Sequence, residues 1–329
     1  MAQFGTVFCD HFAVAEFSDG TWQAHSVKPL TPIKLHPAAH VFHYASTCFE
    51  GFKAYKWSDG TARIFRLHDH VARMQRSAQS LRLPIPDAEQ LADMVIGIVR
   101  HVSDEIPEPP SSLYLRPTLI GTLPNIGAAA APSTEAMLYV LASPVGDYFA
   151  GGASTLKLLV EDQRSRSTEQ LGSTKTGGNY AGALGPTLDA KAEHGVDQVL
   201  FCPGGDVQET GAANFLLISD DEIITKSLDS SFLHGMTRDS ILTLAKDLGY
   251  RIDERTFTVD ELIEKVSSYE AVLSGTAATL SSVGELVHRG ESIPVRDGEP
   301  GPNARKLRDA LQSIQYGNAA DTHGWLTEV

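Results

Sequence analysis

The segment Thr174-Lys175-Thr176-Gly177-Gly178-Asn179-Tyr180 is the most informative stretch of the chain, because it places one lysine among small and polar residues with a tyrosine five positions later. A second segment, Gln208-Glu209-Thr210-Gly211-Ala212-Ala213-Asn214, brings a carboxylate into a similar setting. A lone lysine carries little information. Together, however, the two segments offer an amine that can form a Schiff base, a phenol, and a carboxylate able to bond a pyridinium nitrogen.

These three groups are the ones that pyridoxal phosphate (PLP) requires from a protein. The protein binds and orients this cofactor, while the cofactor carries the chemistry. The two segments therefore predict a PLP-dependent enzyme.

Length and composition limit the alternatives. At 329 residues the chain can bury a sizeable core and is long enough for two domains. Hydrophobic residues make up 42% and charged residues 21%, which is ordinary for a folded protein. The net charge of −14 argues against a nucleic-acid partner, since nonspecific binding to phosphate backbones needs a basic surface.

The apolar stretches argue against a signal peptide or a membrane span. Residues 1–5 contain no basic group, and Asp10, His11 and Glu16 interrupt the next part of the chain. The apolar run from Ala136 to Val145 is too short to cross a bilayer as a helix. We therefore expect a cytoplasmic protein with no membrane partner.

Cysteine and histidine spacing predicts neither disulfides nor a metal site. Cys9, Cys48 and Cys202 are odd in number and widely separated, with no Cys-x-x-Cys pair. The triplet His68-Asp69-His70 lacks the i, i+4 spacing of a helical metal site, so we expect it to be a solvated helix start.

Strand-like and helix-like stretches alternate along the first half, which is typical of a mixed α/β protein. From Leu67 to Leu81 the apolar residues step by four and three, which predicts a helix with one buried stripe. Arg73 lies off that stripe. The segment Leu113-Tyr114-Leu115-Arg116 predicts a strand with Tyr114 and Arg116 on one face.

A Gly-rich, unperiodic piece comes after the apolar run that begins at Ala136. We place an interdomain linker there, at residues 145–155. The expected domains are a small N-terminal α/β domain (1–144) and a larger C-terminal domain (156–329).

In the second half, Gln198 to Phe201 and Asn214 to Ile218 read as a strand and a returning strand, with Glu209 near the end of the hairpin. Thr237 to Leu248 reads as a helix closed by Gly249, and backbone N–H groups at its start can hold an anion. A strand from Ala271 to Leu273 runs into a turn of small residues whose backbone can approach a phosphate or carboxylate.

Seven motifs occur in order over nearly the whole chain: His43-Tyr44, Cys48-Phe49-Glu50-Gly51-Phe52-Lys53-Ala54-Tyr55, Tyr114-Leu115-Arg116-Pro117, Lys175-Thr176-Gly177-Gly178-Asn179-Tyr180, Gly235-Met236-Thr237-Arg238, Ser274-Gly275-Thr276-Ala277-Ala278 and Gly324-Trp325-Leu326. In wording and order they resemble the branched-chain amino-acid aminotransferases, which are class IV (fold type IV) PLP enzymes. The resemblance implies a mixed α/β (α+β) fold with a barrel-like sheet in the C-terminal domain and PLP held between the domains. It also implies a homodimer or a larger homo-oligomer.

The resemblance implies roles for individual residues toward the cofactor. Lys175 resembles the lysine that forms a Schiff base with PLP and then moves a proton. Glu209 resembles the carboxylate that keeps the pyridine nitrogen protonated, and Tyr180 resembles the phenol that bonds the ring oxygen. The remaining cofactor-binding positions, with an arginine and a helix N-terminus suited to a phosphate dianion, are Arg73, Met236, Thr237, Ser274 and Thr276.

For the substrate, the resemblance implies aromatic walls that suit a branched apolar side chain. The backbone amides of Ala277 and Ala278, beside Tyr114, match the site of the substrate α-carboxylate. Arg116 with tyrosine hydroxyls matches the site of the distal carboxylate of glutamate. The predicted substrate-binding residues are Tyr44, Phe49, Tyr114, Arg116, Tyr148, Ala277 and Ala278.

The implied reaction moves the amino group of L-leucine, L-isoleucine or L-valine to 2-oxoglutarate in two half-reactions, with ping-pong kinetics. The enzyme class is branched-chain-amino-acid transaminase. Alternatives of the same fold are a D-amino-acid aminotransferase and an aminodeoxychorismate lyase. A noncatalytic PLP-binding protein is an alternative of another class.

Three stretches depart from the family pattern. His234 stands where many relatives have proline before Gly235, which changes the rigidity and charge of the phosphate loop. The stretch from Arg164 to Ser173 lacks the alanine- and glycine-rich wording that is common before the lysine, so it bears on substrate preference. The segment Ala278-Thr279-Leu280-Ser281-Ser282 lacks the cysteine pair of some animal members and their thiol switch.

Overall fold

The computed structural model describes residues 4–127, 131–146 and 155–329. The chain divides into two compact units, each assembled from separate pieces. The first unit consists of Met1–Asp147, Thr174–Gly177 and Ile314–Val329, and the second of Tyr148–Ser173 and Gly178–Ser313. The boundaries predicted at residues 144 and 156 remain a prediction, and most of the expected linker lies outside the described residues.

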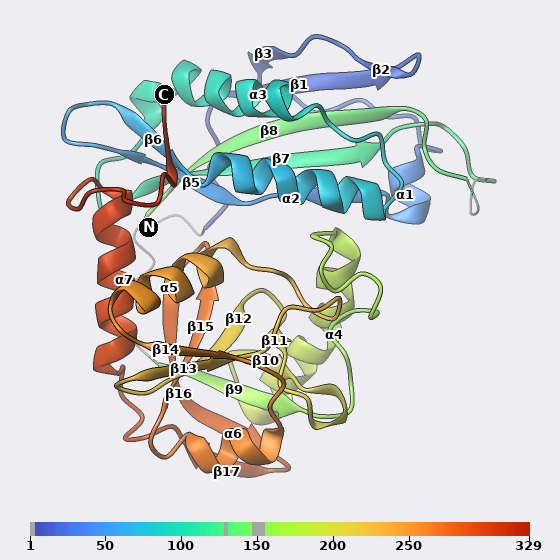
Figure 1. Ribbon diagram of the computed structural model, residues 1–329. Helices are drawn as coiled ribbons and strands as arrows, with labels where there is room; N and C mark the ends of the chain where they lie inside the picture. The colour runs from blue at the N-terminus through green and yellow to red at the C-terminus, as the bar shows by residue number, and fades with distance from the viewer. Residues whose placement is uncertain (1–3, 128–130, 147–154) are drawn as a thin grey trace. The chain divides into compact units, whose positions relative to one another are not determined.

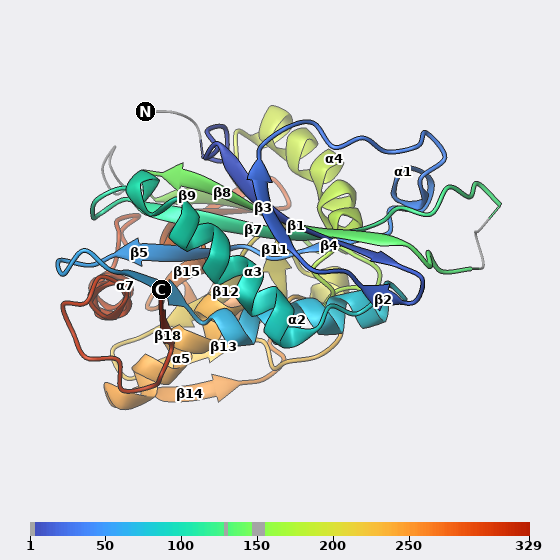
Figure 2. The same ribbon diagram turned by 90° about the horizontal axis from the view of Figure 1, so that it is seen from above.

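An antiparallel sheet forms the centre of the first unit (Figures 1 and 2). Its longest pairing joins β7 and β8, which lie in register from Ser112 opposite Val145 to Gly121 opposite Ala136. Strand β18 pairs with β6 and so brings the Trp325 motif to the edge of this sheet. The strand order is β18 (Leu326–Glu328), β6 (Ala62–Phe65), β5 (Phe52–Lys56), β7 (Ser112–Gly121), β8 (Ala136–Val145), β1 (His11–Ser18) and β2 (Thr21–Trp22), with β3 (Ser26–Pro29) on β1 and β4 (Thr47–Phe49) on β7.

Two helices, α2 (Leu67–Ser80) and α3 (Ala88–His101), pack against this sheet. The predicted stripe on α2 is confirmed, because Leu67, Val71, Met74 and Ala78 all join the core cluster. The expectation of a solvated helix start is wrong for His70, whose side chain is buried. The shorter elements of this unit are α1 (His40–Tyr44) and η1 (Ser103–Glu105).

The sheet of the second unit closes on itself. The short strand β11 (Glu209–Thr210) pairs with both β10 (Gln198–Phe201) and β12 (Asn214–Ile218). Closure produces a barrel in the order β11, β10, β9 (Leu156–Glu161), β16 (Thr279–His288), β15 (Glu270–Gly275) and β12. Strands β13 (Glu222–Thr225) and β14 (Arg251–Glu254) extend the sheet from β12, and β17 (Glu291–Pro294) pairs with β16.

Both predicted strands around Glu209 are therefore confirmed, but they do not pair with each other because β11 lies between them. The predicted helix before Gly249 is α5 (Met236–Asp247), and Gly249 adopts a φ of 89°, a left-handed value that glycine tolerates well. The other helices of the second unit are α4 (Gly177–His194), η2 (Pro203–Gly205), α6 (Val259–Lys265) and α7 (Pro302–Gln315).

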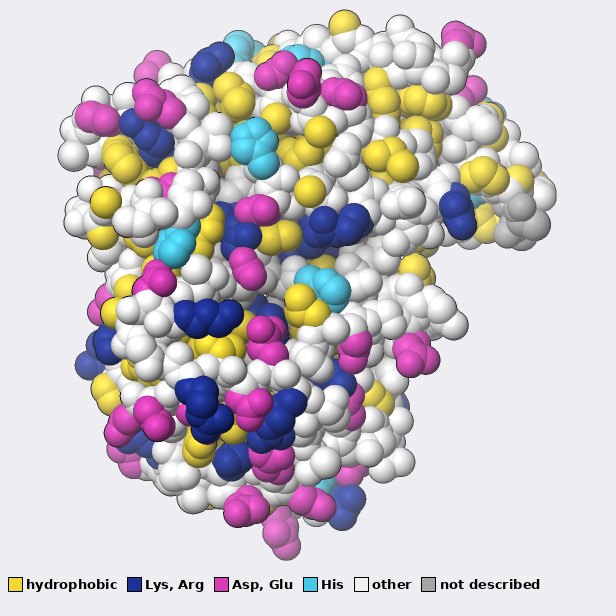
Figure 3. All heavy atoms as spheres, viewed as in Figure 1, with side chains coloured by type: hydrophobic (Ala, Val, Ile, Leu, Met, Phe, Trp, Pro, Cys, Tyr) yellow, Lys and Arg dark blue, Asp and Glu magenta, His cyan; other side chains and the backbone are white. Residues whose placement is uncertain are grey.

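Among the described residues no helix combines the length and hydropathy that a membrane span requires. Cys9, Cys48 and Cys202 are buried free thiols, and burial raises the pKa of Cys48 to about 12. On the face seen in Figure 3, Lys and Arg side chains lie among Asp and Glu side chains.

Candidate active site

The backbone of Lys175 is anchored on the first unit at several points. The Lys175 N–H donates to the hydroxyl of Ser77 on α2 at 3.1 Å, and the Lys175 carbonyl accepts from Phe49 N–H at 3.0 Å. The next residue, Thr176, bridges to Cys48 of β4 and donates its hydroxyl to the Thr47 carbonyl at 2.7 Å. These contacts hold the backbone of Lys175 against α2 and β4, although the segment itself is neither helix nor strand.

A cationic and aromatic cluster surrounds Phe49 in the same unit. The Lys175 Nζ lies 5.1 Å from the centroid of the Phe49 ring, and the Arg116 guanidinium carbon lies 4.6 Å from it. Arg116 Nη2 also donates to the hydroxyl of Tyr114 at 2.8 Å, which places these two side chains together as the strand pattern predicted. Gly51 permits this packing, because a Cβ there would lie 2.0 Å from the Tyr114 hydroxyl oxygen.

Tyr44 and Tyr148 are the two other aromatic residues that the sequence predicts to bind the substrate. Tyr44 ends α1, where its hydroxyl donates to the Ile126 carbonyl and its ring lies 4.8 Å from the ring of His40. Tyr148 lies outside the described residues.

Arg73 belongs to a buried cluster that the sequence did not predict. Its Nε and Nη2 donate to the two carboxylate oxygens of Glu50, both at 2.7 Å, and His70 Nδ1 lies 2.7 Å from Oε2. All three side chains are almost fully buried. Burial alone would raise the pKa of Glu50, but Arg73 and His70 outweigh it and hold that pKa well below its usual value. Burial lowers the pKa of His70, and the attraction of Glu50 offsets only part of this shift.

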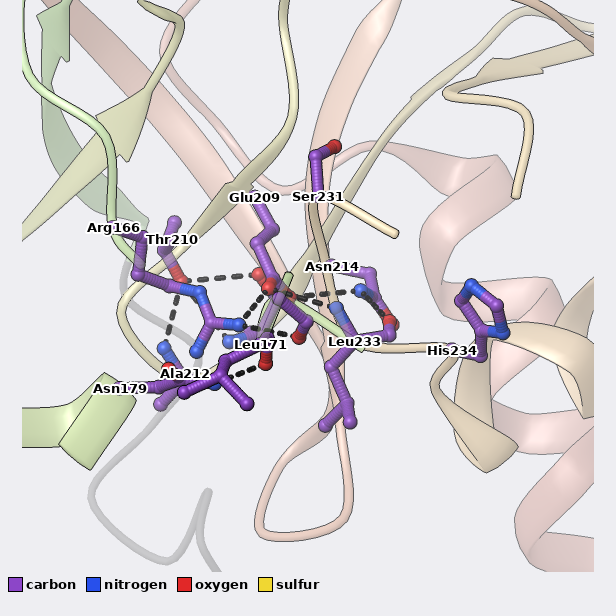
Figure 4. A network of polar contacts seen from close by, with 12 residues as sticks. Arg166, Leu171, Asn179, Glu209, Thr210, Ala212, Asn214, Ser231, Leu233 and His234 are labelled. Atoms are coloured by element: carbon purple, nitrogen blue, oxygen red, sulfur yellow. Dashed lines mark hydrogen bonds and ion pairs between the residues drawn. The ribbon is translucent and has the colours of Figure 1, made fainter. Parts of the chain in front are cut away.

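In the second unit, the carboxylate of Glu209 is buried and held by three neighbours. Oε1 accepts from Leu233 N–H at 2.9 Å and lies 2.7 Å from Arg166 Nη2, while Oε2 accepts from Asn214 Nδ2 at 3.0 Å. Figure 4 shows these three residues directed at the Glu209 carboxylate. Such a set of donors and one buried cation favours the ionised carboxylate.

Arg166 is the functional candidate that sequence reasoning missed. It is 4% exposed, and its Nη2 also donates to the Gly172 carbonyl at 3.0 Å. One indirect signal was present, since Arg166 lies inside the stretch that departs from the family wording. The pairing with Glu209 could not be derived from spacing, because the two residues meet only through the fold of the second unit.

Glu209, Asn214 and Ser274 lie in one row across three adjacent strands. Glu209 of β11 lies opposite Asn214 of β12, and Asn214 lies opposite Ser274 of β15. The hydroxyl of Ser274 is buried and has no hydrogen-bond partner among the described residues. Gly235, the N-cap of α5, also touches this row, because a Cβ there would lie 2.0 Å from the Asn214 side-chain oxygen.

The predicted anion-binding groups occupy two backbone features of the second unit. Met236 and Thr237 form the first turn of α5, whose N-cap makes no side-chain capping bond. Thr276, Ala277 and Ala278 form the turn between β15 and β16. Thr279 comes next with a φ of 61°, a conformation that β-branched residues rarely adopt and that often marks functional sites.

Tyr180 and His234 complete the predicted set. Tyr180 lies in the first turn of α4, next to Asn179, whose amide donates to the Leu171 carbonyl at 2.7 Å. His234 donates from Nε2 to the Asp229 carbonyl at 2.7 Å, and Figure 4 shows its ring turned away from Glu209.

Comparison with known proteins identifies the family. The family model for amino-transferase class IV matches residues 47–286, which include most of the residues described above. The chain belongs to the class IV aminotransferases.

Relatives of this class IV aminotransferase carry a consistent name. The chain is 37% identical to branched-chain-amino-acid aminotransferase 2 of Bacillus subtilis (strain 168), over 99% of this chain and 92% of that protein. It is also 37% identical to the cytosolic branched-chain-amino-acid aminotransferase of Saccharomyces cerevisiae, over 95% of this chain and 88% of that protein.

Solved structures show the same fold type. The crystal structure of the T.th. branched-chain amino acid aminotransferase with pyridoxamine 5'-phosphate superposes with a TM-score of 0.79. Its sequence is 28% identical to this class IV aminotransferase, and the match covers 95% of this chain and 97% of that one.

Proposed function

We propose that this class IV aminotransferase uses PLP to transfer the amino group of L-leucine, L-isoleucine or L-valine to 2-oxoglutarate. The single observation that carries the proposal is the cluster of Phe49, Tyr114 and Arg116 beside the amino group of Lys175. Its aromatic rings suit an apolar branched side chain, and its guanidinium suits the distal carboxylate of glutamate. One site of this composition can therefore serve both the amino donor and the acceptor.

The described residues fit PLP on chemical grounds. The buried Glu209 carboxylate is fixed by three donors and suits a protonated ring nitrogen. The buried Ser274 hydroxyl needs a partner, because an unsatisfied buried polar group is costly. Arg73 supplies a guanidinium and the first turn of α5 supplies a helix N-terminus, and each group is suited to a phosphate dianion.

When bound, PLP supplies an aldehyde that condenses with amines and a ring that withdraws electrons from the attached carbon. Lys175 would hold the cofactor through its Nζ and, once released by the substrate amine, would move the proton at the substrate Cα. The Glu209 carboxylate, which is paired with Arg166, would stabilise a positive charge on the ring nitrogen. The Ala277 and Ala278 amides would hold the substrate α-carboxylate, and Tyr180 would donate to the ring oxygen.

The test is a spectrum followed by a product assay. Purified protein is mixed with PLP, then with L-leucine alone, and finally with 2-oxoglutarate, while the visible absorption of the bound cofactor and the formation of glutamate are measured. We expect leucine to abolish the visible band, 2-oxoglutarate to restore it, and glutamate to form. Lys175→Ala should prevent the band and reduce turnover by roughly a thousandfold or more.

Other outcomes would identify a different function. A band that ignores leucine but responds to a D-amino acid or to aminodeoxychorismate would assign another enzyme of the same fold. A band that ignores every amine would assign a noncatalytic PLP-binding protein. The assembly, expected to be a homodimer or larger, and the cytoplasmic location stay predictions that sedimentation and cell fractionation can check.

A further inference from the structure

The buried cluster around Glu50 holds Arg73 more rigidly than a single ion pair would. Two parallel bonds, from Nε and Nη2 of Arg73 to the two oxygens of Glu50, fix both the position and the plane of the guanidinium. The carboxylate is 1% exposed, so water does not compete for these bonds.

His70 in turn holds Glu50. Its Nδ1 lies 2.7 Å from Oε2, and its ring stacks on Phe52 with centroids 4.6 Å apart and planes 23° apart. Because burial lowers the pKa of His70, the ring is neutral near pH 7 and donates its Nδ1 hydrogen to the carboxylate. His70 therefore orients Glu50 without adding a second buried positive charge.

The arrangement has a chemical purpose only if the orientation of Arg73 matters. An arginine needed merely for stability could be replaced by an apolar side chain, since buried ion pairs are often no better than well-packed hydrophobic residues. An arginine that must receive a dianion in one geometry gains from a fixed guanidinium, because the orientational freedom is lost before binding.

We propose that Glu50 and His70 are positioning residues that hold Arg73 in the orientation that receives the cofactor's phosphate group. This inference rests on the proposed function, in which Arg73 binds that phosphate. Neither residue needs to touch the cofactor for this role, because each acts through Arg73.

The deciding variant is Glu50→Gln. The amide keeps the shape of the side chain but turns one acceptor into a donor that faces the donors of Arg73 or His70. The guanidinium then loses one of its two fixed bonds and can turn. The affinity for PLP is measured by titration of the visible band, in parallel with pyridoxal, which carries the same aldehyde without the phosphate.

We expect Glu50→Gln to weaken PLP binding by about tenfold, while pyridoxal binding changes by less than about twofold. A loss shared equally by PLP and pyridoxal would overturn the proposal in favour of a general structural role. Equal or tighter PLP binding by Glu50→Gln would also overturn it, because Glu50 would then only neutralise Arg73. Wild-type protein that binds PLP no better than pyridoxal would instead remove the proposed phosphate role of Arg73.

A pair of substitutions at His70 keeps the test decisive if Glu50→Gln fails to fold. His70→Asn retains an amide N–H close to the position of Nδ1 and should preserve the preference for PLP over pyridoxal. His70→Leu removes the donor and should reduce that preference. Equal preferences in the two variants would contradict a positioning role for His70.

The matched control is Glu270→Gln, which alters a carboxylate of similar burial in the second unit. Glu270 is 5% exposed and accepts from the Asn303 and Ala304 N–H groups at the start of α7. We expect this variant to lower the melting temperature but to leave the ratio of PLP to pyridoxal affinity unchanged.

Discussion

Both compact units contain a buried carboxylate paired with a buried arginine, and the two pairs differ in which member is the candidate cofactor-binding group. In the first unit Arg73 is the candidate binding group, and Glu50 holds it through two parallel bonds. In the second unit Glu209 is the candidate binding group, and Arg166 lies against one of its oxygens. In the proposed function, the same pair of residue types therefore has opposite roles in the two units.

The two carboxylates, Glu50 and Glu209, also differ in their other hydrogen-bond partners. Glu50 receives a neutral imidazole, whereas Glu209 receives the Asn214 amide and the Leu233 N–H. Removing one member of a buried pair leaves an uncompensated charge, which is costly. A loss of stability is therefore expected from either pair, and the two roles are distinguished by measuring cofactor binding and turnover separately.

The largest effect is expected from the corresponding Glu→Gln substitution in the second unit, at Glu209. In the proposed function, Glu209→Gln removes the negative charge that would face the ring nitrogen, so the electron sink would weaken while the phosphate-binding groups are unchanged. We expect kcat to fall by roughly a hundredfold to a thousandfold, with PLP affinity reduced far less. Stopped-flow measurement of the leucine half-reaction checks this. If Glu209→Gln mainly lowers PLP affinity, the two carboxylates have the same role.

Arg166→Met should have the next largest effect. Without the guanidinium, the buried Glu209 carboxylate keeps only neutral donors and takes up a proton more readily. We expect kcat to fall by about tenfold. The double variant with Glu209→Gln should be little worse than Glu209→Gln alone, because both act on one interaction. Additive losses would contradict this coupling.

The control is Arg255→Met, which breaks ion pairs with Asp253 and Glu261 and should leave kcat unchanged.

Alanine substitutions at two glycines, one in each unit, test the two sites separately. Gly235→Ala places a Cβ 2.0 Å from the Asn214 side-chain oxygen, which should push Asn214 away from Glu209 and lower kcat severalfold. Gly51→Ala places a Cβ 2.0 Å from the Tyr114 hydroxyl oxygen, which should raise the KM for 2-oxoglutarate severalfold. Steady-state kinetics with both substrates distinguishes the two outcomes. Identical changes in kcat and KM would argue for general loss of structure.

The smallest expected effect is on acid stability. The pKa of Glu50 is held below 4.5, so the stability that it contributes is present above pH 4.5 and is lost as the pH falls through its folded-state pKa. The pKa of His70 is held below 6.5, so the unfolded chain gains a proton first and stability falls as the pH drops below 6.5. His70→Asn should therefore flatten the dependence of the melting temperature on pH as the pH falls below 6.5. Parallel curves for the variant and the wild type would refute this.

Local patterns predicted the separate elements well. The periodicity between Leu67 and Leu81 located α2, and the strands Gln198–Phe201 and Asn214–Ile218 have the predicted limits. These predictions succeed because each depends on residues that are neighbours in sequence. Strand pairing depends on residues that are distant in sequence, so the local pattern does not predict the two-residue strand β11 between β10 and β12.

The environment of His70 and the pairing of Arg166 were not predicted, for a related reason. The spacing of His68 and His70 does not suit a metal site and predicts a solvated helix start, yet His70 is buried on the side of α2 that meets Glu50. Arg166 was not chosen because its partner lies far away in sequence. The motifs around Lys175 and Glu209 identified the candidate groups, whereas their supporting residues became visible only in the fold.

The path of the chain has a consequence for dissection of the protein. Because Thr174–Gly177 and Ile314–Val329 belong to the first unit, no single cut separates the two units into continuous fragments. Strand β18 must travel back to pair with β6, with Thr327 opposite Ile64. The sheet that synthesis begins first is thus completed only after the barrel has been made, and removal of β18 would uncover the edge of the very unit that supports Lys175.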